Sequence, residues 1–172
     1  MRLRNGRSAL IFTGVVSVAC LLSSPAYADF NGLPNSARTP GALSASVTQA
    51  TIGQTICVAG YTTSVRPPQS YTHALKVAQL ASGYTVGGST ATADYEEDHL
   101  VPLELGGSPT SPKNLWPQPW AGPLGARQKD ALENALHRLV CSGQLPLATA
   151  QRVFEQNWVA GYRQYILGRS AG

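Results

Sequence analysis

The stretch YEEDHLVPLELGG at residues 95–107, followed by NLWP at residues 114–117, decides the fold of this chain. It predicts one β-hairpin with a short acidic strand, a Gly-Gly turn and a return strand. Asp98 offers oxygen ligands to a divalent cation, and the imidazole of His99 titrates near neutrality, as a base that activates water must. Because successive side chains of a strand point to opposite faces, the two converge on one group only at a strand end or a bulge.

The run EEDHLVPLELGG and the later NLWPQPW resemble the core of HNH-type (ββα-metal) endonucleases. They are most similar to a group of small secreted bacterial proteins built on DHxxPLELGG and NLWP, and the likeness extends from Ile56 through Arg66 to Tyr162. This resemblance implies an α+β fold, in which a small β-hairpin plus a helix form a ββα-metal core with additional flanking helices. It also implies a metal-dependent endonuclease that hydrolyses the phosphodiester bonds of nucleic acid.

The resemblance gives roles to the hairpin residues. His99 is the general base and Asp98 a metal ligand. Glu96 precedes Asp98 by two residues and shares its face, so it is a second ligand, a group that orients one, or part of a solvated acidic strand. Asn114 takes the middle position of the HNH pattern, where it orients the base or fixes the loop, although Asn is also common in simple turns. The expected cofactor is a divalent ion, Mg²⁺ before Mn²⁺ or Zn²⁺.

The third position of the pattern departs from the usual one. HNH hairpins place a metal-binding His or Asn early in the following helix, whereas here a proline-rich insert at residues 117–123 delays that helix. Lys129, Glu133 and His137 fall at four-residue steps and share one helical face. Lys129 suits a contact with phosphate or the stabilisation of transition-state charge, while Asp130, Glu133 or His137 would complete the metal shell. The alternative is a salt-bridged solvent face.

Outside the hairpin, Arg66 is suited to binding a phosphate as a bidentate fork, and equally to a structural role. The chain has no recognition-helix signature, which predicts low sequence specificity, with DNA favoured over RNA. Two other functions stay open: a non-catalytic cell-envelope module that keeps the fold for binding, and a metal-dependent hydrolase of another phosphodiester.

The N-terminus predicts a secretory signal peptide in residues 1–28. Three arginines precede an apolar run at residues 8–22, and the sequence Ala-Tyr-Ala at residues 26–28 is a cleavage site. We therefore expect an exported monomer, extracellular or in the cell envelope, with no stable membrane insertion after cleavage. Without the signal the chain keeps ten basic and nine acidic residues, a net charge of +1, so its charge gives no support to a nucleic-acid partner.

Cys57 and Cys141 are the two cysteines left after the signal is removed. In an exported protein they predict one disulfide, the alternative being two free buried thiols.

Composition and turn residues divide the mature chain. Residues 29–54 are rich in small and polar residues and predict a flexible leader, so that the nuclease domain spans 55–172. The elements expected in it begin with a short strand at 55–58, an extended segment at Val65-Arg66-Pro67 and a helix capped by Ser70 and ending at Gly83. Strands at 95–102 and 114–116 follow, with prolines preventing regular structure beyond. A helix at 126–140 with the apolar stripe Leu132, Leu136, Leu139 and Val140 ends at Gly143, and a last helix starts at Pro146.

Overall fold

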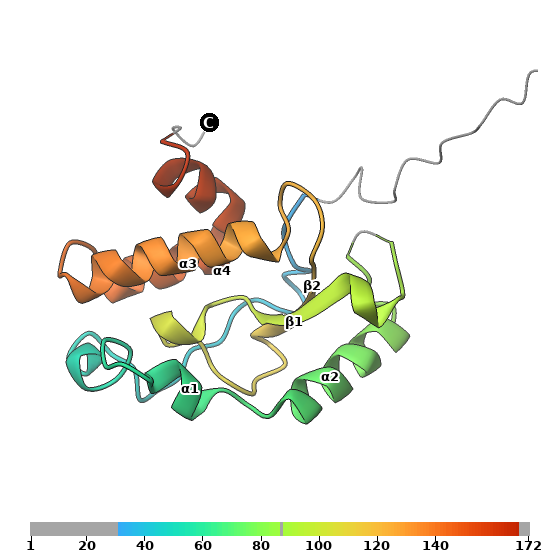
Figure 1. Ribbon diagram of the computed structural model, residues 1–172, viewed down its shortest axis with the longest axis horizontal. Helices are drawn as coiled ribbons and strands as arrows, with labels where there is room; N and C mark the ends of the chain where they lie inside the picture. Colours follow the sequence, from blue (N-terminus) through green and yellow to red (C-terminus); the bar gives the residue numbers. More distant parts are fainter. Residues whose placement is uncertain (1–30, 87, 169–172) are drawn as a thin grey trace, which may run out of the picture.

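The computed structural model describes residues 31–86 and 88–168, so the predicted signal peptide lies outside the described residues. The fold is α+β, with one two-stranded antiparallel sheet and several helices, as predicted (Figure 1). The elements are the short 3₁₀ turns η1 Ile52–Gln54, η2 Thr92–Asp94 and η3 Leu103–Leu105, the strands β1 Tyr95–His99 and β2 Leu115–Pro119, and the helices α1 Tyr61–Val65, α2 Gln69–Ala81, α3 Ala126–Cys141 and α4 Leu147–Tyr165.

The hairpin is shorter at one end and longer at the other than the sequence suggested. β1 ends at His99 rather than at residue 102, whereas β2 runs on through Pro117 to Pro119. Trp120 N donates to Asp94 O at 3.0 Å, so these two residues form a hydrogen-bonded pair. Because hydrogen-bonded and non-hydrogen-bonded pairs alternate along an antiparallel ladder, the pairs that contain Pro117 and Pro119 are non-hydrogen-bonded. The proline nitrogens therefore face the outer edge of the sheet, where no donor is needed, and the expectation that they exclude a strand was wrong.

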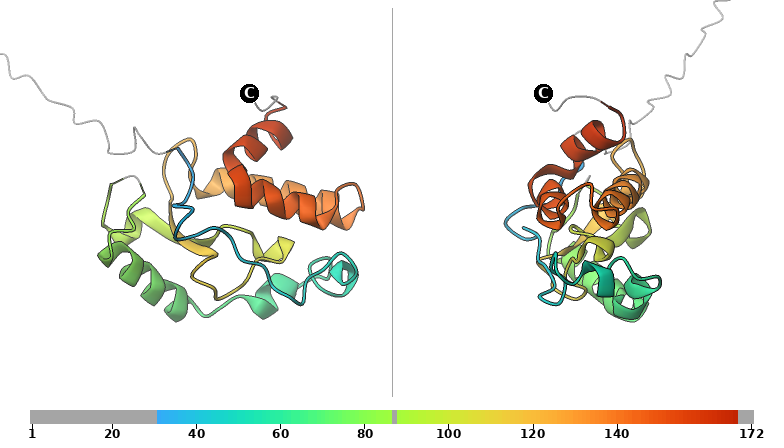
Figure 2. Two further views of the ribbon diagram at one scale, coloured as in Figure 1. Left: turned by 180° about the vertical axis from the view of Figure 1, so that it is seen from behind. Right: turned by 90° about the vertical axis from the view of Figure 1, so that its left-hand side faces the viewer.

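The hairpin lies between two helical layers. Figures 1 and 2 show α1 and α2 on one side and the packed pair α3 and α4 on the other. α2 is joined to the outer edges of both strands: Lys76 Nζ donates to Tyr95 O at 2.7 Å, and Gln79 Nε2 donates to Leu115 O at 2.9 Å. These edges are thereby covered, because an open edge would otherwise leave carbonyl groups unpaired.

The main core fills the space between the hairpin and the α3–α4 pair. α3 contributes the buried side chains of Leu132, Leu136 and Val140, three of the four residues of the predicted apolar stripe, while the fourth, Leu139, is only partly buried. α4 begins directly after Pro146, as predicted, and adds Phe154 and Trp158. Its last turns change direction at Asn157, whose backbone leaves helical geometry and whose Oδ1 accepts from Ala160 N at 2.9 Å, so that Asn157 caps a new helical segment.

The prediction of a flexible leader is wrong for the part of residues 29–54 that the structure describes. Gly41 N donates to Lys113 O at 2.9 Å, Ser44 N donates to Gly106 O at 2.8 Å, and Leu43 forms a bridge with Gly107. Val47 is buried in the core. The segment has few large apolar side chains because backbone hydrogen bonds to the hairpin loop, rather than side-chain burial, hold it in place.

Three further expectations need correction between Thr55 and Ser70. Residues 55–58 form turns closed by local hydrogen bonds, not a strand, because no other strand lies beside them. Val65 ends the short helix α1, and the extended segment begins only at Arg66, as the proline after it requires. α2 starts at Gln69, so Ser70 lies inside its first turn and does not cap it.

The predicted disulfide is present. Cys57 and Cys141 are bonded with their Cα atoms 5.6 Å apart, and the bond closes a separation of 84 residues. It joins the turn before α1 to the end of α3, and so links the two helical layers at one end of the hairpin. Within residues 31–86 and 88–168, no helix is long and apolar enough to cross a membrane.

Candidate active site

A buried lysine lies between β1 and α3, at the point where the sequence predicted a metal site. Lys129 Nζ is 2.7 Å from Asp98 Oδ2 and also pairs with Glu133 Oε1. It donates a third hydrogen bond to His99 O at 2.6 Å and lies 5.4 Å from the centre of the Phe154 ring. The side chain of Lys129 has no exposed surface. It therefore cannot contact phosphate, and that prediction is corrected: its role is to position β1 against α3.

The charge of Lys129 is maintained by its partners. Burial by itself lowers the pKa of Lys129, but the charges of Asp98 and Glu133 outweigh it and hold the pKa above its ordinary value. Burial raises the pKa of Glu133, Lys129 opposes that rise, and Asp98 adds to it. One ammonium group thus faces two carboxyl groups, and the pKa of about 8 for Glu133 favours the protonated form of the second at neutral pH. Asp98 Oδ1 has no hydrogen-bond partner among the described residues.

His99 is fixed in a single tautomer. Its Nε2 lies 2.9 Å from Pro109 O. A carbonyl oxygen only accepts, so Nε2 carries the proton and the Nδ1 lone pair is left to accept one. Burial lowers the pKa of His99 below its ordinary value, while the hydrogen bond to Pro109 and the charge of Asp98 oppose this incompletely. A neutral imidazole with a free Nδ1 is the form that a general base requires.

Asn114 fixes the loop that holds His99. Its Oδ1 accepts from Val101 N at 2.9 Å, and its Nδ2 donates to Val101 O at 3.0 Å and to Ser108 O at 3.1 Å. Ser108 precedes Pro109, so the Asn114 side-chain amide helps to fix the position of the Pro109 carbonyl group. That carbonyl in turn orients the imidazole of His99. Gly107 completes this packing, because a Cβ there would lie 1.8 Å from Val101 O. Of the two roles expected for Asn114, the structure places it in contact with the loop and not with the base.

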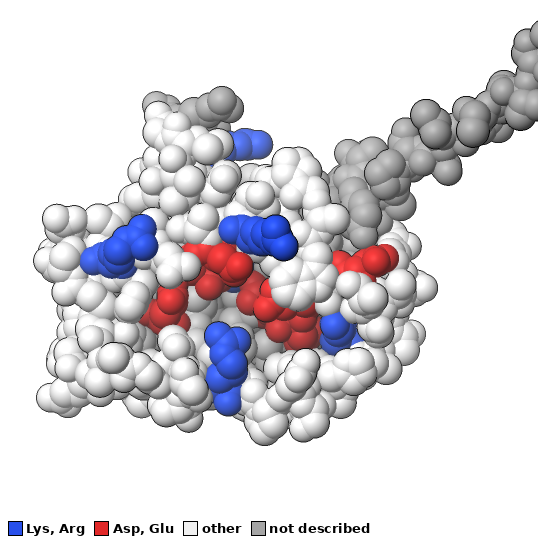
Figure 3. All heavy atoms as spheres, viewed as in Figure 1, with Lys and Arg blue, Asp and Glu red and all other residues white. Residues whose placement is uncertain are grey.

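A cleft of about 500 Å³ opens beside His99. The hairpin contributes Glu96 and Glu97 to its lining, and the opposite wall contributes Arg66, which follows α1, and Lys76 of α2. Figure 3 shows acidic side chains gathered in the hollow of this face, with Lys and Arg side chains around them. The exposed Arg66 forms no salt bridge within the described part of the chain, so its guanidinium is available to a ligand.

Neighbouring carboxylates on this face raise each other's pKa values, because each negative charge disfavours ionisation of the next group. Burial raises the pKa of Glu96 to about 7, and the charges of Asp98 and Asp130 add to the rise. Burial likewise raises the pKa of Glu97 to about 8, again with a contribution from Asp98. Glu97 had no role in the sequence analysis, yet both of its carboxylate oxygens are buried without a hydrogen-bond partner among the described residues. A cation in the cleft would relieve this repulsion.

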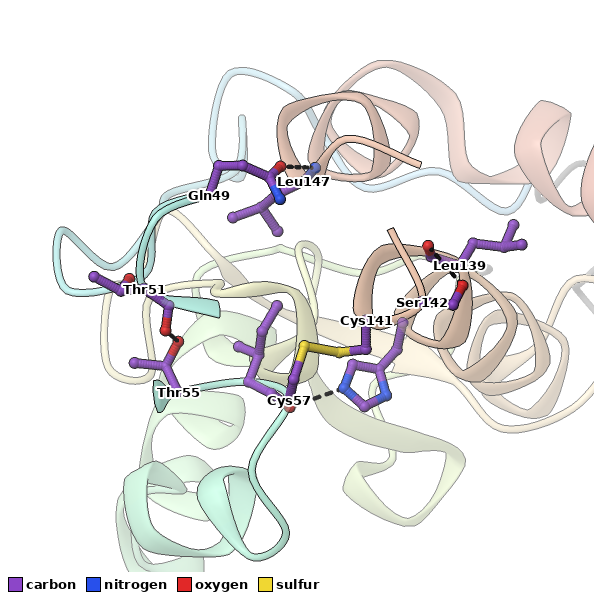
Figure 4. Close-up of a disulfide and its surroundings, with 10 residues drawn as sticks. Gln49, Thr51, Thr55, Cys57, Leu139, Cys141, Ser142 and Leu147 are labelled. Atoms are coloured by element: carbon purple, nitrogen blue, oxygen red, sulfur yellow. Dashed lines mark hydrogen bonds between the residues drawn. A yellow bond between two sulfur atoms is a disulfide. The ribbon is translucent and has the colours of Figure 1, made fainter. Parts of the chain in front are cut away.

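His137 does not belong to this site, contrary to one of the predictions. Its Nε2 lies 2.8 Å from Ile56 O. A ring nitrogen of His137 also lies within 4.8 Å of the sulfur atoms of Cys57 and Cys141, which form the disulfide shown in Figure 4. His137 is eight residues beyond Lys129, which is roughly 12 Å along a helix axis. A single ion near Asp98 is therefore out of its reach.

The residues present suit one kind of metal ion. Among the described residues, only Cys57, His137 and Cys141 bring three ligand atoms within 4.8 Å of one another. The two sulfur atoms are bonded to each other, so this trio is not a zinc site. The acidic residues near Asp98 form no closed cage of that kind. They suit a hydrated Mg²⁺ or Mn²⁺, which is commonly held by one or two carboxylates together with water and a substrate phosphate.

Comparisons with protein-family models, with curated proteins and with solved structures find no match to this chain.

Proposed function

We propose that this protein is an exported, metal-dependent endonuclease of the HNH type that hydrolyses nucleic-acid phosphodiester bonds with low sequence specificity, DNA before RNA. The observation that carries the proposal is the state of His99. Pro109 O engages its Nε2 at 2.9 Å, its Nδ1 is free to accept a proton, and the residue lines a cleft together with Glu96, Glu97 and Arg66. The hairpin followed by α3 has the order of elements that a ββα-metal core requires.

The proposed reaction is an in-line displacement at phosphorus. His99 Nδ1 takes a proton from water while the water oxygen forms a bond to phosphorus, and the bond from phosphorus to the 3′ oxygen breaks. The products are a 5′-phosphate and a 3′-hydroxyl, whose proton comes from solvent. When bound, a divalent ion supplies a Lewis acid that stabilises negative charge on the phosphate and the leaving oxygen. Asp98 Oδ1 and Glu96 would hold it, and Lys129 keeps Asp98 in position.

The charge of the cleft supports a metal-dependent mechanism. In their ionised forms Glu96 and Glu97, which line the cleft, together with the nearby Asp98 and Asp130, would repel a phosphate diester, and the two cations of the lining, Arg66 and Lys76, do not balance all four. A divalent cation reverses the sign of the field where the phosphate must bind. The raised pKa values of Glu96 and Glu97 are what such a site has before a cation enters it.

The test is cleavage of plasmid DNA, of single-stranded DNA and of RNA by the mature protein, with Mg²⁺ or Mn²⁺ and with EDTA. We expect cleavage only with metal, and a loss of about 10² to 10⁴ in rate for His99→Ala. His73→Ala is the matched control, because His73 lines the same cleft from the exposed side of α2. Wild-type rates in EDTA, or from a folded His99→Ala protein, would refute the proposed mechanism.

One observation favours a second function, a non-catalytic module that keeps the fold for binding. Lys129 already neutralises Asp98 and Glu133 in part, as a metal ion would. This alternative predicts that the folded protein cleaves neither nucleic acid nor a simple phosphodiester such as bis(p-nitrophenyl) phosphate, and that Mg²⁺ and Mn²⁺ leave its melting temperature unchanged. Cleavage of the small diester without cleavage of DNA or RNA would instead indicate a hydrolase of another phosphodiester.

A further inference from the structure

Trp120 differs from the other tryptophans of the chain. Trp116 and Trp158 are fully buried, whereas Trp120 is 47% exposed. The sequence has three tryptophans in all, so Trp120 is the single one in contact with solvent. An exposed indole loses the favourable free energy of burial, and a large aromatic ring left at the edge of a cleft is typical of a binding surface.

The position of Trp120 is set by the backbone although its ring is exposed. It follows β2 directly, and its N–H donates to Asp94 O at 3.0 Å. The insert then turns back tightly, so that a Cβ at Gly125 would lie 2.4 Å from Trp120 O. Any other residue at 125 would displace this turn. The ring is therefore presented from a fixed point at the end of the hairpin.

Trp120 separates two hollows. On one side it lines the cleft of about 500 Å³ that contains His99 and Arg66. On the other side it lines a second hollow, of about 400 Å³, with the exposed Arg127 at the start of α3. Each hollow thus has a guanidinium group in its lining as well as Trp120, so the two together offer one stacking surface and two places for a phosphate.

We propose that Trp120 stacks a nucleobase of a single-stranded nucleic acid, with the phosphates on either side of that base held by Arg66 and Arg127. This inference rests on the proposed nuclease function and names its substrate class. The acidic lining repels phosphates from the floor of the cleft, so a neutral base is the part of the strand that enters most easily. A cleft of this volume, within the range of about 300–1,000 Å³ typical of small-molecule sites, suits one nucleotide rather than a duplex. In a duplex the bases stack on each other and are not available to the indole.

The experiment uses the fluorescence of Trp120, which does not require cleavage. The parent protein is the mature His99→Ala variant in Mg²⁺, titrated with single-stranded oligothymidylate. We expect partial quenching of the emission, and no quenching with a Trp120→Phe variant, because Trp116 and Trp158 are out of contact with solvent. A duplex of the same length should quench much less.

Affinity is measured separately by the anisotropy of a labelled oligothymidylate. Trp120→Ala should weaken binding roughly tenfold, since stacking on one aromatic ring contributes at least this much, while Trp120→Phe should keep most of the affinity. Tyr71→Ala is the matched control, because Tyr71 is an exposed aromatic residue of α2 outside the cleft. Melting curves of each variant establish that it is folded.

The outcomes separate this inference from the proposed function. Binding without quenching, equal binding by Trp120→Ala and its parent, equal quenching by duplex, or no binding of any oligonucleotide would overturn the role of Trp120. Cleavage by the wild-type protein is scored independently. Quenching without any cleavage by the wild-type protein would support the stacking site and refute the proposed nuclease function. Cleavage without quenching would support the nuclease function and refute the stacking site.

Discussion

Lys129 Nζ lies 2.7 Å from Asp98 Oδ2, and the lysine side chain has no exposed surface. The pair joins the first turns of α3 to the end of β1 in the middle of the molecule. A buried ammonium is tolerated only where carboxylates and carbonyls surround it, and here Glu133 and His99 O complete its shell. The contact between Lys129 and Asp98 thus has two effects: it positions the candidate metal ligand, and it holds α3 against β1.

Lys129→Met should destabilise the fold by about 3 kcal/mol, because it leaves two partly buried carboxylates without their partner. The measurement is urea unfolding followed by circular dichroism. Lys113→Met is the control, since Lys113 is exposed, and should change the free energy of unfolding by less than about 0.5 kcal/mol. Equal stability of the two variants would show that the buried ion pair contributes nothing net.

The stability of the metal-free protein should fall as pH rises from about 4.5 to 8. Burial raises the pKa of Glu97 in the folded state to about 8, so the folded state binds more protons than the unfolded state over this interval. The contribution of Glu97 is fully present below its unfolded pKa and is lost as the pH rises through the folded value.

Glu97→Gln removes the ionisable group, and with it the loss of stability at high pH, while keeping the shape of the side chain. Its melting temperature in EDTA should exceed that of the wild type by a few degrees at pH 8 and match it at pH 5. Glu155→Gln, a change at an exposed position on α4, is the control. A wild-type melting temperature that rises steadily from pH 5 to pH 8 in EDTA, with no gain from Glu97→Gln, would contradict the assignment.

Asn114→Ala should cost about 3 kcal/mol, because it leaves the backbone groups of Val101 and Ser108 unpaired in a buried position. Asn114→Asp is informative beside it: the carboxylate still accepts from Val101 N but faces two carbonyl oxygens as a charge. Both variants should therefore be destabilised if the loop contact is the role of Asn114. A stable Asn114→Asp protein would indicate that only the acceptor matters. Asn134→Ala, at an exposed position on α3, serves as the control.

Replacing both Cys57 and Cys141 by Ala should lower the free energy of unfolding by about 4.5 kcal/mol, the value expected for a closed loop of this length. Reduction with dithiothreitol should destabilise the wild type by a similar amount and leave the double variant unaffected. A loss below about 1 kcal/mol would mean that the loop is held by its other contacts, such as the hydrogen bond from Leu147 N to Gln49 Oε1 at 2.8 Å.

Much of the fold follows from local chemistry and could be predicted. The apolar stripe at helical spacing and Gly143 indicated α3 to within a residue of its end, and Pro146 marked the start of α4. The two cysteines predicted their own bond. Such features depend on a few neighbouring residues, or on a pair with no other partner available, and so they can be read without knowledge of the rest of the chain.

The site depended on what lies opposite each side chain, and this only the tertiary structure decided. The four-residue spacing of Lys129, Glu133 and His137 indicated a shared face, but steps of roughly 6 Å along the axis bring these residues to different neighbours. Lys129 meets Asp98 and becomes an internal cation, Glu133 joins it, and His137 reaches the turn beside the disulfide. Spacing in sequence determines direction around a helix. Partners depend on long-range packing, which no local pattern contains.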